Sequence, residues 1–249
     1  MAPGASRTPN AVDTWAAVSS LQLLGQTVPR RKLLIGWLRE RQSDDGGFES
    51  LVIAEAVLRT LRQLQAKPLR NPRPYLLARS GRISRGIAKS TAAGIWLANA
   101  RRCAELFTIH ELPLGPLRVA LEPLTSRLRD RSGGYVTPGP GVIDTWHTIK
   151  LASLVGLRLS AATAEFVRRC ENATLGITLT PDTSASSLES QLAGTESLQC
   201  LGSPCRYANA IRKFAVRCQA DNGGFARVPG ALLGLRDTHR ALAVLTVLG

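Results

Sequence analysis

The chain of 249 residues is long enough to bury a sizeable core in one large domain or two small ones, and its formal net charge is +14. Its apolar runs are well short of a membrane span, and its first twenty residues contain no secretory signal. Five cysteines without a Cys-x-x-Cys pair argue against a disulfide framework or a zinc finger, so a soluble, cytoplasmic protein is expected.

Residues 1–11 are predicted to be a flexible N-terminus, followed by a single domain over residues 12–249. The first predicted helix is VDTWAAVSSLQLLG at 12–25, and its pattern returns as IDTWHTIKLASLVG at 143–156 and RDTHRALAVLTVLG at 236–249. Each copy begins with Asp-Thr and continues with apolar residues at helical spacing. Each also has glycine twelve residues after the aspartate, where a helix C-terminus favours a left-handed residue.

Weaker copies of this apolar helix begin at Ser50, near Ser90-Thr91 and at Ser190. Together with the Asp-Thr copies they predict six apolar helices, and the intervals between them leave room for a second set. Amphipathic helices of that second set are predicted at 29–42, 116–131, 161–170 and 205–219, and about five are expected in all.

A glycine pair followed by an aromatic residue comes after three of the amphipathic helices, at 46–48, 133–135 and 223–225. The glycines permit a tight turn, and the aromatic ring can pack back between helices. Apolar helices suit an inner ring and amphipathic helices an outer ring, and no convincing strand is present. The predicted fold is therefore all-α: a closed α/α toroid with about six inner and five outer helices.

The positive charge is unevenly distributed along the chain. Between Glu55 and Glu105 there is no acidic residue, whereas arginines and lysines are frequent. Such a stretch attracts polyanions, which include nucleic acid, an anionic membrane surface and a phosphorylated small molecule. The alternative is an arginine-rich surface that only keeps the protein soluble.

Three stretches, at 41–50, 131–156 and 218–249, resemble the repeats of the superfamily of protein prenyltransferase β subunits and squalene-type terpene cyclases. In that superfamily a Gln-x-x-Asp-Gly-Gly-Phe turn precedes an inner helix that begins with Asp or Thr. The resemblance implies the toroid, an isoprenoid substrate in an apolar central cavity with a basic rim, and a partner subunit of the kind that completes the site in prenyltransferases.

The functional motifs of both branches are incomplete. Prenyltransferases bind zinc through an Asp, a Cys two residues later and a His before the last repeat's Thr. Here Asp144 matches the Asp, but Trp146 and Asp237 replace the Cys and the His, so zinc is not expected. Squalene-type cyclases use the middle Asp of Asp-x-Asp-Asp-Thr as proton donor, whereas residues 141–145 read GVIDT.

Four residues are candidate catalytic groups: Asp13, Asp144, Asp237 and His239. The three aspartates begin inner helices, whose N-termini are expected to meet at one mouth of the cavity. The structural alternative is that each aspartate caps its helix and complements the helix dipole. His239 is the best single acid–base candidate because the pKa of histidine is near neutrality, and its alternative is a structural role.

Trp15 and Trp146 are candidate substrate-binding residues whose ring faces would stabilise a carbocation, with core packing as the alternative. A diphosphate would be bound by basic side chains near the start of the helix at residue 90. The candidates are Arg82, Arg85 and Lys89 at spacings i, i+3 and i+7, and Arg227 as a second choice. The alternative for these four is a solvated surface.

The predicted function is an isoprenoid-processing enzyme, similar to a terpene cyclase or a prenyltransferase, that acts on a prenyl diphosphate by non-standard acid chemistry. Two alternatives stay open: a non-catalytic lipid-binding or scaffold toroid, and a binder of polyanions through its basic stretch. No cofactor is predicted, except Mg²⁺ if a diphosphate is bound. A partner subunit and an anionic membrane surface are both compatible with the sequence as binding partners, whereas nucleic acid is not favoured.

Overall fold

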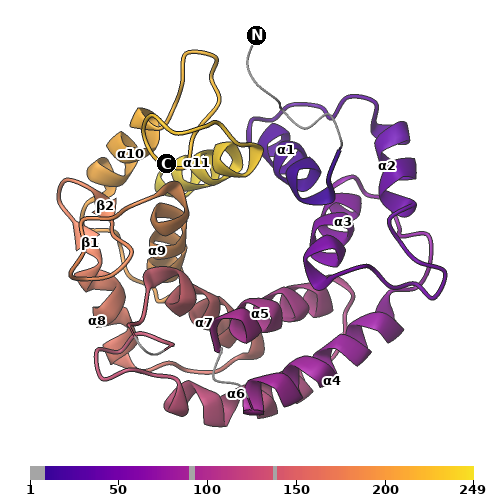
Figure 1. Cartoon of the computed structure of the whole chain (residues 1–249), viewed down its shortest axis with the longest axis horizontal. Coiled ribbons are helices and arrows are strands. Elements are labelled where there is room, and N and C mark those ends of the chain that lie inside the picture. The colour runs from indigo at the N-terminus through magenta and orange to yellow at the C-terminus, as the bar shows by residue number, and fades with distance from the viewer. Residues whose placement is uncertain (1–8, 90–92, 137–138) are drawn as a thin grey trace.

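The computed structural model describes residues 9–89, 93–136 and 139–249, without the side chains of residues 87–89, 93 and 124. Over these residues the chain forms two concentric rings of helices, as predicted (Figure 1). The inner ring consists of α1 (Ala11–Leu23), α3 (Leu51–Gln63), α5 (Ala93–Ile109), α7 (Val142–Val155), α9 (Leu188–Cys200) and α11 (Leu235–Leu248). The outer ring consists of α2 (Arg31–Arg39), α4 (Arg73–Lys89), α6 (Gly115–Arg127), α8 (Ala161–Arg169) and α10 (Ala208–Arg217).

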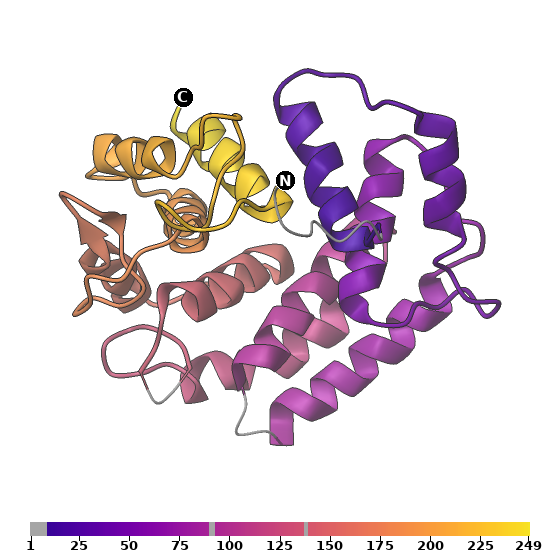
Figure 2. The same cartoon turned by 45° about the horizontal axis from the view of Figure 1, so that its top comes forward.

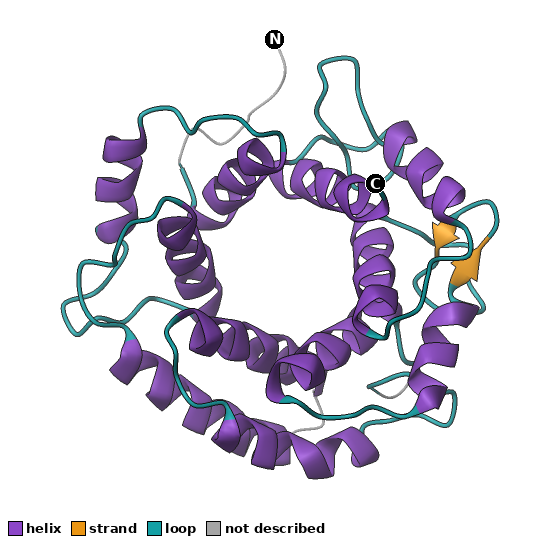
Figure 3. Cartoon of the chain, turned by 180° about the vertical axis from the view of Figure 1, so that it is seen from behind, coloured by secondary structure: helices purple, strands orange, loops and turns teal. Residues whose placement is uncertain are grey.

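Each inner helix packs against the next inner helix in the chain, and α11 packs against α1, which closes the ring (Figure 3). The outer helices follow because their amphipathic pattern leaves one apolar face to bury. Leu38 of α2, Phe166 of α8 and Phe214 of α10 are buried against the inner ring. The outer helix α4 runs beside α5 (Figure 2). None of the described helices is long and apolar enough to cross a bilayer.

The Gly-Gly-aromatic turns have the predicted role, and the Asp-Thr signature explains how two of them are held. The rings of Phe48, Tyr135 and Phe225 are buried. Thr145 Oγ1 accepts a hydrogen bond from the Tyr135 backbone N at 3.1 Å, and Thr238 Oγ1 accepts one from the Phe225 backbone N at 3.1 Å. The threonine of the signature therefore ties the preceding turn to the start of the inner helix.

A two-stranded hairpin was not predicted. It pairs β1 (Glu171–Asn172) with β2 (Gly176–Ile177) in antiparallel register. Gln191 of α9 holds the hairpin: its Oε1 accepts from the Ile177 backbone N at 3.0 Å, and its Nε2 donates to the Leu175 carbonyl at 2.7 Å. Strands of two residues are too short for an alternating hydrophobic pattern to reveal.

Two predicted boundaries fall at or next to residues that the structure does not describe. The predicted N-terminus 1–11 is described only from residue 9, and Ala11 is already the first residue of α1. The predicted start near Ser90-Thr91 lies outside the described residues, within which α5 begins at Ala93.

Candidate functional site

The six inner helices surround a pocket of about 270 Å³, here called the central pocket. The prediction of an apolar cavity is wrong, because the lining carries six arginine or lysine side chains and four glutamates. The lining residues are Val12, Trp15, Val52, Glu55, Ala56, Arg59, Arg101, Arg102, Glu105, Trp146, His147, Lys150, Glu189, Leu192, Glu196, Arg236, His239 and Arg240. With neutral histidines, this lining has a cationic excess of two charges.

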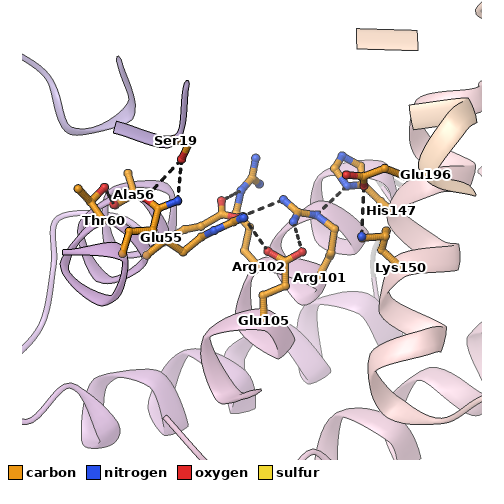
Figure 4. Close-up of polar contacts among 12 residues, drawn as sticks. Ser19, Glu55, Ala56, Thr60, Arg101, Arg102, Glu105, His147, Lys150 and Glu196 are labelled. Carbon is orange, nitrogen blue, oxygen red and sulfur yellow. Dashed lines mark hydrogen bonds and ion pairs between the residues drawn. The ribbon is translucent and has the colours of Figure 1, made fainter. Parts of the chain in front are cut away.

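Arg101 of α5 is the most buried charged side chain of the pocket, with 7% of its surface exposed. Its Nη1 donates to Glu105 Oε1 at 2.6 Å, and its Nη2 donates to Glu55 Oε1 at 3.3 Å (Figure 4). Its Nε donates to His147 Nδ1 at 3.1 Å. These four residues, called the Arg101 network, join α3, α5 and α7. Satisfying a guanidinium in three directions is what makes its burial tolerable.

Two further arginines complete the network. Arg59 Nη1 lies 3.3 Å from Glu55 Oε1 and 3.2 Å from Glu105 Oε2, and Arg102 Nε lies 3.0 Å from Glu55 Oε2. Burial alone would raise the pKa of Glu55, but Arg101, Arg59 and Arg102 together hold it below its ordinary value. Glu55 and Glu105, which lie at the two ends of the stretch without acidic residues, thus form ion pairs with Arg59, Arg101 and Arg102.

Both pocket histidines are neutral at pH 7. Burial and then Arg101 and Arg102 lower the pKa of His147 to about 3. Burial and then Arg59 and Arg240 lower the pKa of His239 to about 4. His239 was the predicted acid–base candidate; it lines the pocket, but it holds no imidazolium proton to donate at neutral pH.

Trp15 and Trp146, the predicted substrate-binding residues, both line the pocket, but each ring already faces an arginine of the protein. The guanidinium carbon of Arg59 lies 4.9 Å from the Trp15 ring centroid, and that of Arg101 lies 5.0 Å from the Trp146 centroid. Trp146 Nε1 donates to Glu196 Oε2 at 2.9 Å. The buried Trp15 Nε1 has no hydrogen-bond partner among the described residues.

The aspartates of the signature do not cap their helices, which corrects the structural alternative. The N-caps of α1, α7 and α11 are Asn10, Gly141 and Gly234, and each aspartate is the third helical residue. In α1 the Asn10 side chain accepts from the backbone N of Asp13. An acidic side chain in the first turn still complements the helix dipole, so that part of the expectation is retained.

The three aspartates are also separated from the central pocket. Asp13 Oδ1 lies 3.5 Å from Arg236 Nε, and Asp237 Oδ1 accepts from Arg240 Nη1 at 2.9 Å. Asp144 faces the start of α5, where a Cβ on Gly94 would lie 3.0 Å from its Oδ1. Burial raises the pKa of Asp144. None of the three is among the residues that line the central pocket.

The predicted diphosphate ligands lie elsewhere. Arg82 and Arg85 are exposed on the outer helix α4, which precedes the inner helix α5, and neither lines the central pocket. The side chain of Lys89 lies outside the described residues. Arg227 is 57% exposed and lies 3.0 Å from Glu189 Oε2, at the edge of the pocket.

Sequence reasoning missed most of the charged lining. Two signals were available, because Glu55–Arg59 and Arg101–Glu105 are pairs at i,i+4 on predicted helices. The bonds from Glu55 to Arg101 and Arg102 join residues more than 40 positions apart, and spacing along one helix gives no sign of them.

The pocket does not fit a metal ion. In the described part of the chain, no group of three or more His, Cys, Asp or Glu side chains is arranged to hold one. Each pocket glutamate is already bound by an arginine or lysine. The positions that match the zinc ligands of prenyltransferases hold Asp144, Trp146 and Asp237, which supply neither thiolate nor imidazole.

Comparison with known proteins finds a matching family and similar solved structures. The family described as the prenyltransferase alpha-alpha toroid domain matches residues 2–62 and 191–249, the two ends of the chain that meet where the ring closes. The structure of Candida albicans protein geranylgeranyltransferase-I complexed with GGPP is similar, with a TM-score of 0.74 over 96% of this chain and 84% of that one. At 13% identity, this likeness concerns the fold. No curated protein sequence matches the chain.

Proposed function

We propose that this chain, which carries the α/α toroid of the prenyltransferase β-subunit superfamily, binds a prenyl diphosphate with the diphosphate in the central pocket. The observation that carries the proposal is the cationic excess of the lining, in which six basic side chains from four inner helices converge on about 270 Å³. Guanidinium groups in a partly desolvated site bind phosphate oxygens in forked geometry.

The arginines keep hydrogen-bonding capacity for such a ligand. A guanidinium has five N–H donors. In the described structure Arg59 makes its hydrogen bonds to protein through Nη1 alone, and Arg102 makes its own through Nε and Nη1. An anion between these groups would satisfy donors that the carboxylates leave over.

A reaction on the bound isoprenoid is a second proposal, and Asp144 is its candidate acid, which the substrate would have to reach outside the central pocket because Asp144 does not line it. Burial raises the pKa of Asp144, which is the shift that a proton donor needs. Asp13 and Asp237 are each paired with an arginine, and His239 is neutral. Mg²⁺ and zinc have no part in this proposal, because each pocket glutamate is engaged by an arginine or a lysine. If the protein does not convert the bound isoprenoid into a product, the alternative is a lipid-binding toroid without catalytic activity.

Isothermal titration with geranyl diphosphate tests the binding proposal. Arg102→Ala and Lys150→Ala should each weaken binding at least tenfold, since each removes a cation from the lining. Lys213→Ala, an exposed cation on α10, is the charge-matched control and should change affinity less than twofold. If Arg82→Ala with Arg85→Ala weakens binding while the pocket variants do not, the diphosphate binds on α4 and the proposal is wrong.

Product analysis tests the reaction separately. The protein is incubated with geranyl and farnesyl diphosphate, with and without Mg²⁺, and hydrocarbon and alcohol products are identified by mass spectrometry. Turnover that is lost in Asp144→Asn while affinity is retained supports Asp144 as the acid. Saturable binding without product supports the non-catalytic alternative.

A further inference from the structure

A second and larger cavity of about 620 Å³ lies at the closure of the ring, and it is here called the seam groove. It is bounded by the outer face of α1, the start of α2 and the start of α11. Most of its lining is apolar and includes Ala17, Val18, Leu21, Leu34 and Leu235. Its volume lies within the range of about 300–1,000 Å³ that is usual for small-molecule sites, whereas the central pocket falls just below it.

The groove is open because the ring has one outer helix fewer than it has inner helices in the described part of the chain. The outer helix α2, which follows α1, packs on α3, and α10 packs on α11 and α9. Within the described residues, the outer face of α1 therefore borders the groove beside Leu235, which is 50% exposed. Exposed apolar surface of this kind marks a binding site when it is contiguous.

The two cavities lie on either side of the α1–α11 contact and have one lining residue in common, Arg236. On α1, Val12 and Trp15 line the central pocket, whereas Asp13 and Ala17 line the groove. The N-terminal ends of α1 and α11 thus form a narrow wall with a charged site on one side and an apolar site on the other. Arg236 projects at this wall, 60% exposed and 3.5 Å from Asp13.

The central pocket suits the head of an amphiphile but not its tail. Its lining is charged on all sides, and the burial of a hydrocarbon chain among these groups would desolvate them without compensation. The chain gains free energy only where it leaves water for an apolar surface, and the seam groove is such a surface next to the head.

We propose that the ligand is an amphiphile whose anionic head lies in the central pocket and whose hydrocarbon chain crosses the N-terminal ends of α1 and α11, beside Arg236, into the seam groove. The proposal rests on the function proposed above. It adds a site for the chain and predicts that affinity depends on chain length.

Titration with a series of ligands tests this on the intact protein. The series is inorganic pyrophosphate, then dimethylallyl, geranyl and farnesyl diphosphate. The affinity should rise at least about tenfold with each five-carbon unit that enters the groove. Ala17→Phe, which fills the groove, and Leu21→Asp, which makes it polar, should each abolish this rise and leave the affinity for pyrophosphate within twofold.

Val119→Asp on α6 is the matched control, because it replaces an apolar residue that is 72% exposed elsewhere on the outer ring, and it should keep the full rise. Circular dichroism melts confirm that each variant folds. If pyrophosphate fails to bind, the proposed function is wrong. If pyrophosphate binds but the rise is absent, or persists in both groove variants, the chain lies elsewhere and this inference is overturned. A dimer lost in Leu21→Asp without any effect of chain length would overturn it in favour of a second copy in the groove.

Discussion

The two flanks of the central pocket use the same chemistry at different depths. On the α3–α5 flank, the side chains of Arg101, Glu55 and Glu105 are 7%, 14% and 17% exposed. On the α9–α11 flank, Glu189 pairs with Arg240 at 2.6 Å and with Arg227 at 3.0 Å, and its side chain is 28% exposed. Both flanks are networks of arginine and glutamate, so composition alone does not distinguish them.

Burial makes the difference between the flanks. When one partner of a buried ion pair is removed, the other charge is left uncompensated in a medium of low dielectric. When one partner of an exposed pair is removed, water solvates the remaining charge. The α3–α5 flank should therefore contribute more to the stability of the ring than the α9–α11 flank does.

The largest effect is expected for Arg101→Ala. This change leaves Glu55 and Glu105 without the more buried of the two arginines that they share, and it should lower the free energy of unfolding by about 3–5 kcal/mol. Urea denaturation followed by circular dichroism measures it. A loss below about 1 kcal/mol would mean that the other arginines replace Arg101, and the contrast between the flanks would disappear.

The turns before α7 and α11 extend the comparison to the backbone. Gly133 has φ +95°, and a Cβ there would lie 2.1 Å from the Ala162 carbonyl oxygen; Gly223 has φ +83° and no such neighbour within 4 Å. Gly133→Ala should cost about 2–4 kcal/mol, from strain plus overpacking. Gly223→Ala should cost only about 1–2 kcal/mol. Equal thermal destabilisation of the two variants would contradict this.

The pH dependence of stability should reveal both pocket histidines, His147 beside Arg101 and His239 on α11. The folded-state pKa values, about 3 for His147 and about 4 for His239, lie below the unfolded value near 6.5, so both contributions are complete above pH 6.5 and are lost as the pH falls. Between pH 6.5 and 5.5 each histidine should remove about 1 kcal/mol of stability. Denaturation curves at both pH values should show a smaller difference for His147→Asn and for His239→Asn than for the unmodified chain.

The smallest effect is expected on the exposed side of the α9–α11 flank. Arg227→Ala removes a pair whose arginine is 57% exposed, and it should change stability by less than about 1 kcal/mol. The melting temperature at low and high salt checks this. A change as large as that of Arg101→Ala would show that exposure does not separate the two flanks.

Most of the fold could be predicted from repetition. The Asp-Thr helices and the Gly-Gly-aromatic turns recur in one order, and the alternation of apolar with amphipathic helices suits an inner and an outer layer. The role of the threonines was not predicted, because Thr145 bonds a backbone N ten residues away across a turn. The caps were assigned to the aspartates, whereas the chain begins each of these helices two residues earlier.

The candidate site was predicted only in part. Trp15, Trp146 and His239 do line the central pocket. Arg82 and Arg85 were chosen from an acid-free stretch, whose inward-facing members are Arg59, Arg101 and Arg102. A run of like charges in the sequence gives no sign of which members meet a carboxylate, because that depends on the rotation of each helix about its own axis in the ring.

The sequence by itself determined the alternation of apolar and amphipathic helices, the turns between them, and hence the toroid, because these depend on local spacing along the chain. The tertiary structure alone decided that the interior is charged and that an apolar groove lies outside the ring at its closure. Both features arise between residues far apart in sequence, such as Glu55 with Arg101 and Asp13 with Arg236. Such pairs acquire their energies only when helix packing removes water from between them.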